Sequence, residues 1–291
     1  MLKLLFGEKI WYDGLLFNSG ESYNVLMLLG AVLVIAAVAY LLGNVNTAIL
    51  ITRLVYKEDI RTKGSGNPGM TNVMRNYGWL PALFTLLGDM FKCMLSMVVG
   101  TLVFGILGAY IAGLFCVLGH IAPVIYKFKG GKGVSSSAMF LLYVNPLAFL
   151  ITLIIFVLIV LSTKYLSLAS VITVLMMPLL LFRMEAMMDP IGAMVFSPIR
   201  VIITLLNALL VVFLHRENIK RIMNKTERRF SIKRTVKKGE AAVEELPPEP
   251  AEETEEVDDV EYIYVDEEEE SSPEALARKA ENRKKSKSKK K

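Results

Sequence analysis

The sequence has little of what metal centres and disulfide frameworks are built from. Its 291 residues include two cysteines and two histidines. Cys93 and Cys116 both lie inside apolar runs and lack the spacing of a zinc site, so we expect them to pack as small hydrophobic residues. We therefore expect no disulfide, no metal site, no cofactor and no nucleic-acid partner.

Charge is also scarce. Charged residues make up 21% of the chain and hydrophobic residues 54%, and the apolar residues gather into long runs, which excludes an ordinary soluble domain. The first 24 residues contain no convincing secretory signal, because the apolar stretch at 4–6 is short and "GEK" interrupts it. Several later runs reach the roughly 20 residues that a helical membrane span needs. The predicted fold class is all-α, a polytopic helical membrane protein with about seven transmembrane helices.

The apolar runs and the residues that interrupt them predict where the helices lie. "NP" at 145–146 ends one run, because proline disfavours helical geometry in the residue before it. The segment 134–144 is short for a full crossing, so six true spans remain an alternative. The predicted helices lie near 25–51, 80–104, 107–125, 134–144, 147–163, 168–184 and 199–215.

Basic residues predict the orientation of these helices. With seven spans, the loops that carry Lys and Arg residues, together with the segment 215–234, fall on one face of the bilayer. The positive-inside rule assigns that face to the cytoplasm. The N-terminus is then expected outside and the C-terminus in the cytoplasm.

The end of the chain differs from the rest in charge. Residues 240–291 contain nine Lys and Arg against eighteen Asp and Glu, a net charge of −9, which leaves +14 for the remainder of a chain whose total is +5. A segment of this composition cannot bury enough apolar surface to fold. We expect an N-terminal extension at 1–24, a membrane domain at 25–230 and a disordered charged tail at 231–291.

A glycine-rich stretch, "GSGNPGMTNVMRNYG", follows the first predicted span. Its glycines permit tight turns that bring backbone close to a ligand, and Arg75 offers a bidentate fork for phosphate. Ser65, Asn67 and Asn72 add groups that form hydrogen bonds. The stretch predicts an anion site, and the alternative is an ordinary turn at the membrane surface.

A second stretch, "KFKGGKGV" at 127–134, combines lysines with glycines. It is not a nucleotide P-loop, because that pattern needs Gly where the chain has Tyr126 and Ser or Thr where it has Gly133. The stretch still predicts a phosphate site. The alternative is a topology signal, which explains the lysines but not the glycines. The candidate residues are Lys129, Gly130, Gly131, Lys132 and Gly133.

Other polar residues lie at or within the predicted spans. His120 and His215 fall at cytoplasmic ends, and His215 shares a helical face with Asn218 in "HRENIKRIMNKTERRF". That segment is also typical of an amphipathic basic helix on anionic lipid. Asp89 and Lys92 lie within an apolar run, where they either neutralise each other or place Lys92 beside a site.

Three stretches, "GSGNPGMTNVMR", "GHIAPVIYKFKGGKGV" and "HRENIKRIMNKTE", resemble the motifs of the bacterial membrane glycerol-3-phosphate acyltransferases that use acyl phosphate, the PlsY family. "GDMFK" and "STKYLSLAS" are similar to stretches between those motifs, and the resemblance covers about residues 25–230. Met70 stands where the family usually has alanine. Lys225 stands where it usually has glycine.

The resemblance implies transfer of a fatty acyl group from acyl phosphate to the primary hydroxyl of glycerol 3-phosphate, giving lysophosphatidate and phosphate. The site is expected on the cytoplasmic side of the bacterial inner (plasma) membrane, where both substrates and membrane phospholipid meet. Either His215 or a substrate phosphate is expected to take the hydroxyl proton. The residues implied as catalytic are Ser65, Arg75, His215 and Asn218. Those implied in substrate binding are Asn67, Asn72, Lys92, His120, Lys129, Gly130, Gly131, Lys132 and Gly133.

Two other classes of protein remain as alternatives. A transporter of organic phosphates would also use lysines, but it would usually show inverted repeats and polar groups on broken helices. A scaffold that binds anionic headgroups explains the basic loops but not the spacing of Gly, Asn and Ser around Arg75. An acyltransfer assay separates these classes from the enzyme.

Overall fold

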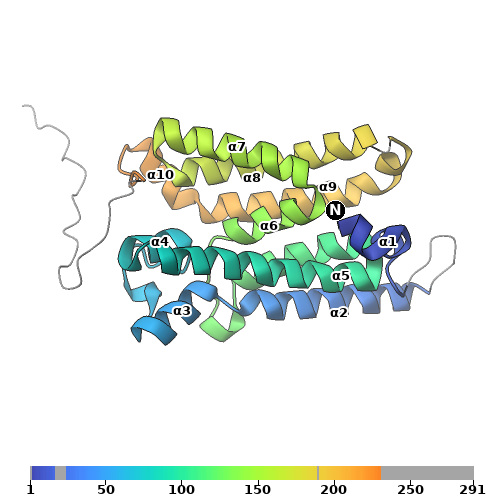
Figure 1. Cartoon of the computed structure of the whole chain (residues 1–291), viewed down its shortest axis with the longest axis horizontal. Helices are drawn as coiled ribbons and strands as arrows, with labels where there is room; N and C mark the ends of the chain where they lie inside the picture. Colours follow the sequence, from blue (N-terminus) through green and yellow to red (C-terminus); the bar gives the residue numbers. More distant parts are fainter. Residues whose placement is uncertain (1, 17–23, 189, 231–291) are drawn as a thin grey trace, which may run out of the picture. The chain divides into compact units, whose positions relative to one another are not determined.

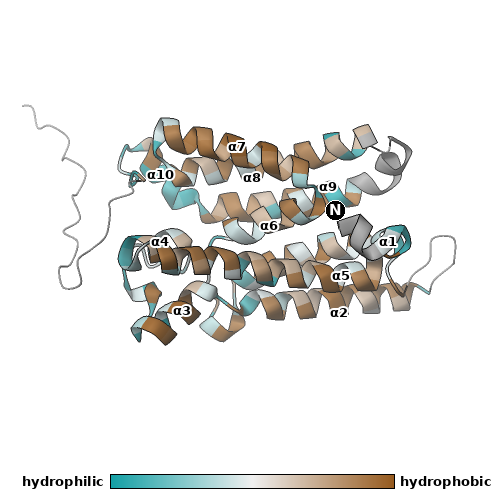
Figure 2. Cartoon of the chain, viewed as in Figure 1, coloured by the Kyte–Doolittle hydropathy of each residue, from teal (hydrophilic) through white to brown (hydrophobic). Residues whose placement is uncertain are grey.

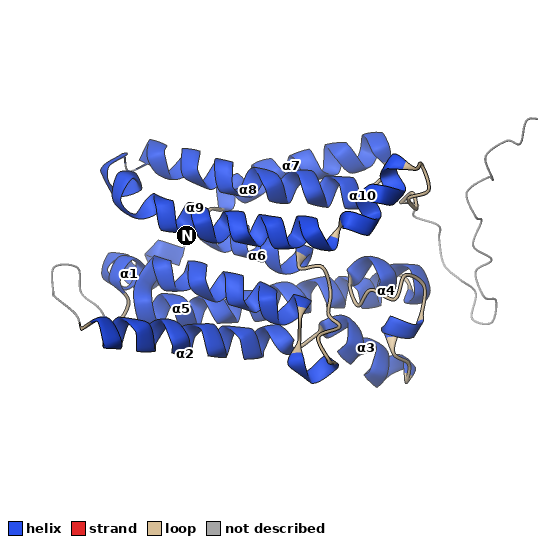
Figure 3. Ribbon diagram, turned by 180° about the vertical axis from the view of Figure 1, so that it is seen from behind, coloured by secondary structure: helices blue, strands red, loops and turns tan. Residues whose placement is uncertain are grey.

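The computed structural model describes residues 2–16, 24–188 and 190–230. In this part of the chain every regular element is helical (Figure 3). The tail predicted at 231–291 lies outside the described residues. The elements, in chain order, are α1 (Leu2–Asp13), α2 (Val25–Asn44), α3 (Thr47–Tyr56), η1 (Ile60–Thr62), α4 (Met70–Tyr77), α5 (Trp79–Ile121), η2 (Val124–Tyr126), α6 (Val134–Val144), α7 (Pro146–Thr163), α8 (Leu166–Met188), α9 (Pro190–Leu214) and α10 (Arg216–Met223).

The long helices are apolar enough to cross a bilayer. Hydrophobic residues run along their lengths, and hydrophilic residues are frequent near α4 and α10 (Figure 2). The prediction of a polytopic helical membrane protein is confirmed, and the orientation in the membrane stays a prediction. Four stretches of the described chain are long and apolar enough, with α9 and α10 as a fifth if that bent pair is one span: Val25–Tyr56, Trp79–Tyr126, Pro146–Thr163 and Leu166–Met187.

α5 is a hairpin of two antiparallel limbs. Its helical geometry is interrupted at Phe104 and Gly105, where Gly105 takes a positive φ of 54° that glycine adopts without strain. The limbs pack so closely that a Cβ added to Gly100 would collide with the carbonyl oxygen of Gly108. The helices predicted near 80–104 and 107–125 therefore exist as the two limbs.

The first predicted helix, 25–51, is interrupted in the structure. α2 ends just before Val45, and Asn46 caps α3 with its side chain. Lys92 of α5 donates hydrogen bonds to the carbonyl oxygens of Gly43 and Val45, at 3.2 and 2.5 Å. A cation at the last carbonyls stabilises a helix end. A charged residue distant in the sequence therefore holds the point where α2 stops.

The short helix α6 and the helix that follows form a second hairpin. The 11 residues of α6 span about 16 Å at the helical rise, well short of an apolar core about 30 Å thick. This length favours the alternative of six full crossings. Asn145 caps α7 by accepting a hydrogen bond from the backbone N–H of Ala148.

The ring of Trp11 in α1 stacks on Tyr143 at 6.1 Å, so part of the predicted N-terminal extension packs against the membrane helices (Figure 1).

Candidate active site

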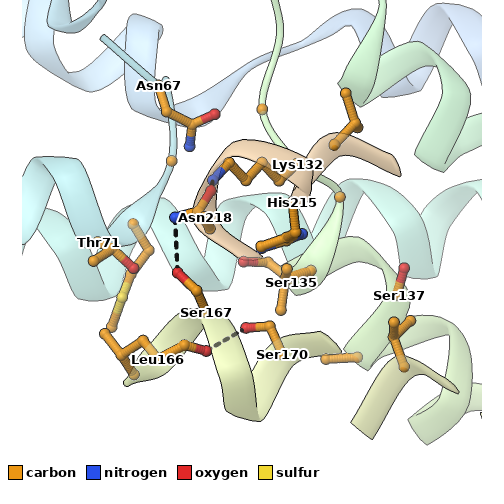
Figure 4. Close-up of a pocket in the computed structure, with 18 of the residues that line it drawn as sticks. Asn67, Thr71, Lys132, Ser135, Ser137, Leu166, Ser167, Ser170, His215 and Asn218 are labelled. Carbon is orange, nitrogen blue, oxygen red and sulfur yellow. Dashed lines mark hydrogen bonds between the residues drawn. The ribbon is translucent and has the colours of Figure 1, made fainter. Parts of the chain in front are cut away.

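A cavity of about 1100 Å³ lies where the glycine-rich loops meet the membrane helices. Its polar end is lined by residues of both loops, of α4 and of α10, and its remainder by α5, α6, α7 and α8. In Figure 4, Lys132, Asn218, His215, Ser135 and Ser167 lie close to one another in this polar end. The cavity therefore joins a hydrophilic, cation-rich end to an apolar part.

The apolar part is a trough formed mainly by one face of α7. Its residues follow one another at helical spacing, and they are Phe149, Leu153, Phe156, Val157 and Leu161. Leu153, Val157 and Leu161 line the cavity although they are 41%, 44% and 61% exposed. The trough is therefore open at these three residues toward the outer surface of the helices.

The structure brings the predicted site residues together from four segments that are far apart in the sequence. Lys92 is the exception, since it does not line the cavity. The predicted residues that do line it are Ser65, Asn67, Asn72, Arg75, His120, Lys129, Gly130, Gly131, Lys132, Gly133, His215 and Asn218.

Asn72 organises the first loop. Its side-chain oxygen accepts hydrogen bonds from the backbone N–H of Ser65 and the amide of Asn76, both at 3.1 Å. Its side-chain nitrogen donates to the carbonyl oxygens of Ile60 and Lys63, at 3.3 and 3.0 Å. Because the loop itself engages this amide, the geometry favours a structural role over the predicted contact with substrate.

The glycines of the second loop serve a different purpose from the phosphate cradle that we expected. The backbone N–H groups of Gly130 and Gly131 donate to the carbonyl oxygens of Ile121 and His120, both at 3.1 Å, and so point into the protein. A Cβ at Gly130 would collide with the His120 carbonyl oxygen, so close packing requires glycine here. The N–H groups of the first turn of α6, which begins at Val134 on the cavity wall, lack partners within the helix and can bind an anion.

Lys132 is held by a polar network that reaches α10. Its ammonium donates to the side-chain oxygen of Asn218. The nitrogen of the same amide donates to Ser167 Oγ at 2.9 Å and to Glu227 Oε1 at 2.7 Å. Glu227 also pairs with Arg221 Nε at 2.8 Å and is 9% exposed. Its carboxylate therefore fixes α10 to the cavity wall.

Two groups at the polar end have altered acid–base properties. Burial lowers the pKa of Lys132 to about 8; Glu227 opposes this shift, and the positive charges of Arg221 and Arg75 add to it. Burial likewise lowers the pKa of His215 to about 4. At neutral pH the lysine is therefore mostly charged and the histidine is neutral.

The tautomer of His215 follows from one hydrogen bond. Its Nδ1 lies 2.8 Å from the carbonyl oxygen of Val211, which can only accept. Nδ1 therefore carries the proton of the neutral ring, and Nε2 carries the lone pair. His215 thus offers an acceptor for a hydroxyl proton, while its imidazole is fixed by the end of α9.

Lys92 lies behind the cavity wall rather than in it. Its side chain is 5% exposed, and its ammonium is 3.0 Å from Asp89 Oδ1 and 2.8 Å from His120 Nδ1. Together with the two carbonyl oxygens at the end of α2, these contacts occupy the ammonium. Of the two roles left open for Asp89 and Lys92, the geometry favours mutual neutralisation.

Several hydroxyl side chains of the cavity wall were not among the predicted residues. Ser167 has the clearest function, because it donates to Glu227 Oε1 at 2.6 Å and accepts from Asn218. Its only signal in the sequence was that "STKYLSLAS" is similar to a stretch of the family. Serines are too common in loops and helix ends to be selected by type alone. The others are Ser135, Ser137, Ser170, Thr71, Thr152 and Thr173.

Lys225 takes the left-handed conformation, with φ of 58°, two residues after α10 ends at Met223. Its N–H donates to the carbonyl oxygen of Ile222, so the turn that a glycine would make is kept at a steric cost. We expect Lys225→Gly to stabilise the protein by about 0.5–1 kcal/mol, measured by thermal unfolding in detergent. Lys220→Gly, inside α10, is the matched control and should destabilise by a similar amount. Equal effects of both substitutions would contradict the strain at Lys225.

Comparisons with known proteins agree with this geometry. The model of the glycerol-3-phosphate acyltransferase family matches residues 33–225. A glycerol-3-phosphate acyltransferase of Finegoldia magna is 40% identical over 198 residues, which cover 67% of this chain and 94% of that protein. One of Clostridioides difficile is 36% identical over 208 residues, covering 69% and 97%.

A solved structure adds the fold. The crystal structure of PlsY (YgiH), an integral membrane glycerol 3-phosphate acyltransferase in its glycerol 3-phosphate form, matches with a TM-score of 0.61 at 30% identity, covering 69% of this chain and 96% of that one. Its lysophosphatidic acid form matches equally, at 31% identity. The predicted resemblance is thereby confirmed, and the chain belongs to the glycerol-3-phosphate acyltransferase family.

Proposed function

We propose that this chain transfers a fatty acyl group from acyl phosphate to the primary hydroxyl of glycerol 3-phosphate, giving lysophosphatidate and phosphate. The reaction takes place in the plasma membrane of a bacterium, with the polar end of the cavity on the cytoplasmic side. The active residues are those of the membrane domain at 25–230.

One observation carries this proposal, namely the union of a cation-rich end and an apolar trough in one cavity. Glycerol 3-phosphate is small and anionic, whereas an acyl phosphate has an anionic head and a long apolar chain. Burial of apolar surface stabilises a bound acyl chain in proportion to its area. Lysines and arginines in a partly desolvated site stabilise phosphate groups strongly. The two ends of the cavity match the two ends of the donor.

The polar residues divide between the two phosphates. Lys129, Lys132 and the first turn of α6 hold the phosphate of glycerol 3-phosphate, with the glycines shaping the loop. Arg75 of α4 and Ser65 hold the phosphate of the donor, with Asn67 on the same loop as Ser65. Asn218 accepts from the Lys132 ammonium while Ser167 and Glu227 engage its amide nitrogen, so its part in the reaction is to position Lys132.

Acyl transfer itself requires one proton to move. The hydroxyl oxygen of glycerol 3-phosphate attacks the acyl carbon, the bond from that carbon to the phosphate oxygen breaks, and phosphate leaves with the electron pair. His215 Nε2 accepts the hydrogen bond of the attacking hydroxyl and orients it. With a pKa of about 4, His215 is a weaker base than a phosphate whose second pKa is about 6. The departing phosphate therefore ends with the proton.

The length of the trough indicates how long an acyl chain it can cover. From Phe149 to Leu161 its wall runs about 18 Å at the helical rise. An extended hydrocarbon chain of tetrahedral carbons advances about 1.25 Å per bond, so the trough covers about 14 carbons. Donors with saturated chains of about this length should show the lowest KM.

The experiment that tests the proposal uses membranes that contain this protein, with labelled glycerol 3-phosphate. Palmitoyl phosphate, an acyl carrier protein thioester and an acyl-CoA serve as separate donors. We expect labelled lysophosphatidate with the acyl phosphate alone. Transfer from a thioester and not from acyl phosphate would show that the donor is a thioester. If folded protein transferred no acyl group from any donor, the cavity would be assigned to binding or transport instead of catalysis.

The pH dependence of kcat/KM should report the deprotonation of Lys132. Its ammonium binds phosphate, and its pKa of about 8 means that the charge is lost as the pH rises through 8. We expect kcat/KM for glycerol 3-phosphate to fall above pH 8, by up to about tenfold per pH unit, because this ratio reports the free enzyme. Lys132→Arg keeps its charge to far higher pH and should remove the decline. A wild-type profile that stays flat to pH 9.5 would contradict the role of Lys132.

A further inference from the structure

Three buried ionisable residues meet at the base of the polar end. Asp89 and Lys92 lie on the first limb of α5 and His120 at the end of the second limb. They are 1%, 5% and 3% exposed. Asp89 also accepts a hydrogen bond from Thr47 Oγ1 at 3.1 Å, at the first residue of α3. The cluster thus ties the α5 hairpin to the break between α2 and α3.

The contacts of this cluster decide where the proton of His120 lies. The Lys92 ammonium faces Asp89 Oδ1 and two backbone carbonyl oxygens, all of which can only accept, so the lysine must donate. It is also 2.8 Å from His120 Nδ1. Asp89 Oδ1 lies farther from Nδ1, at 3.5 Å, and the three N–H groups of the ammonium match its three shortest contacts, which are with Val45, His120 Nδ1 and Asp89. An ammonium has no lone pair, so Nδ1 accepts. The proton of the neutral imidazole is therefore on Nε2.

The opposite edge of the same ring faces the two glycine-rich loops. A Cβ added to Gly131 would collide with His120 Nε2 and would lie 3.0 Å from the carbonyl oxygen of Pro68. Gly131 also donates its N–H to the backbone carbonyl of His120. His120 lines the cavity, whereas Lys92 does not. The Nε2–H group thus lies where both loops meet the cavity.

We propose that Asp89 and Lys92 are positioning residues that hold His120 as the Nε2–H tautomer, so that Nε2–H donates a hydrogen bond to the phosphate of glycerol 3-phosphate. The inference rests on the proposed function and deepens it. It assigns the two histidines opposite tasks: His215 accepts through Nε2, and His120 donates through Nε2. Each task is fixed by the partner of the other ring nitrogen, Val211 for one and Lys92 for the other.

Nitrogen NMR of the full chain in detergent tests the tautomer without any turnover. The sequence has only two histidines, so selective ¹⁵N-histidine labelling gives two rings, and a His120→Asn sample assigns them. At pH 7 we expect a protonated Nε2 and a bare Nδ1 for His120, and the reverse for His215. Added glycerol 3-phosphate should shift the Nε2 signal of His120. A proton on Nδ1 of His120 would overturn the proposal.

Two substitutions at His120 separate binding from packing. His120→Asn leaves an amide oxygen near the place of Nδ1, where Lys92 can donate, but leaves nothing at Nε2. His120→Gln places an amide N–H near the position of Nε2. We expect His120→Asn to raise the KM for glycerol 3-phosphate about tenfold or more, and His120→Gln to keep it within about threefold. The KM for acyl phosphate should change little in either variant.

These outcomes distinguish the proposal from a purely structural role and from failure of the proposed function. If His120 only packs, both variants lower the melting temperature and neither changes the KM selectively. A larger effect on the KM for acyl phosphate would assign His120 to the other phosphate and overturn the proposal. Absence of acyl transfer by the wild-type protein would refute the proposed function instead, while the tautomer would still be measured. If neither variant folds, the nitrogen spectrum of the wild-type protein still tests the proposal, because it shows which ring nitrogen of His120 carries the proton.

Discussion

Lys132→Ala is expected to lower kcat/KM for glycerol 3-phosphate by about 100-fold to 1000-fold. Lys132 is the lysine that the structure fixes within the polar end, through Asn218 and its link to Glu227. Preorganised charges in such desolvated sites typically contribute about 2.7–4 kcal/mol to catalysis, which is the origin of this range. The measurement is steady-state transfer to labelled glycerol 3-phosphate in membranes with matched amounts of protein.

The control is another lysine of the same face. Lys220 on α10 is exposed and does not line the cavity, so Lys220→Ala should keep nearly full activity. Arg75→Ala should also lose most activity, because its guanidinium lies at the same polar end. Wild-type turnover by well-folded Lys132→Ala or Arg75→Ala protein would remove that residue from the mechanism.

Asp89→Asn is expected to destabilise the protein by about 3–5 kcal/mol. The substitution leaves the ammonium of Lys92 buried without its counter-charge, with neutral His120 and two carbonyl oxygens as its partners. Breaking a buried ion pair from one side typically costs this much. Unfolding by heat or denaturant in detergent, followed by helical circular dichroism, measures the change.

A double substitution separates loss of the charge pair from loss of packing. Asp89→Asn combined with Lys92→Met removes both charges and should recover a large part of the stability, because no unpaired charge remains. Asp59→Asn is the comparison at a more exposed site, where Arg53 and Arg61 lie near water, and should cost much less. An unchanged melting temperature for Asp89→Asn would show that the ion pair between Asp89 and Lys92 does not stabilise the fold.

The sequence predicts the membrane helices well because the bilayer imposes a simple rule. Long apolar runs must be helical in lipid, so 80–104, 147–163 and the other runs correspond to helical segments in the structure. Most of the predicted site residues line the cavity, because the two loops that carry them combine glycines with cationic and hydrogen-bonding side chains. The family motifs then added His215 and Asn218.

The features that the sequence did not predict have a shared physical origin, which is contact between residues distant in the chain. The break between α2 and α3 at Val45 depends on Lys92, and no pattern in the neighbouring sequence predicts it. The use of the Gly130 and Gly131 amides depends on the carbonyl oxygens at the end of α5. Ser167 matters only because α8 carries it to Asn218 and Glu227. Such pairings become visible when the helices pack.

The open side of the trough along α7 has a consequence for membrane growth. Under the proposed reaction, a new headgroup is assembled at the depth where the donor's own phosphate rested, and the acyl tail keeps the same direction throughout. The product therefore returns sideways to the leaflet that supplied the donor. New lipid of this kind enters one monolayer only, and the opposite monolayer can expand only if a separate process moves lipid across the bilayer.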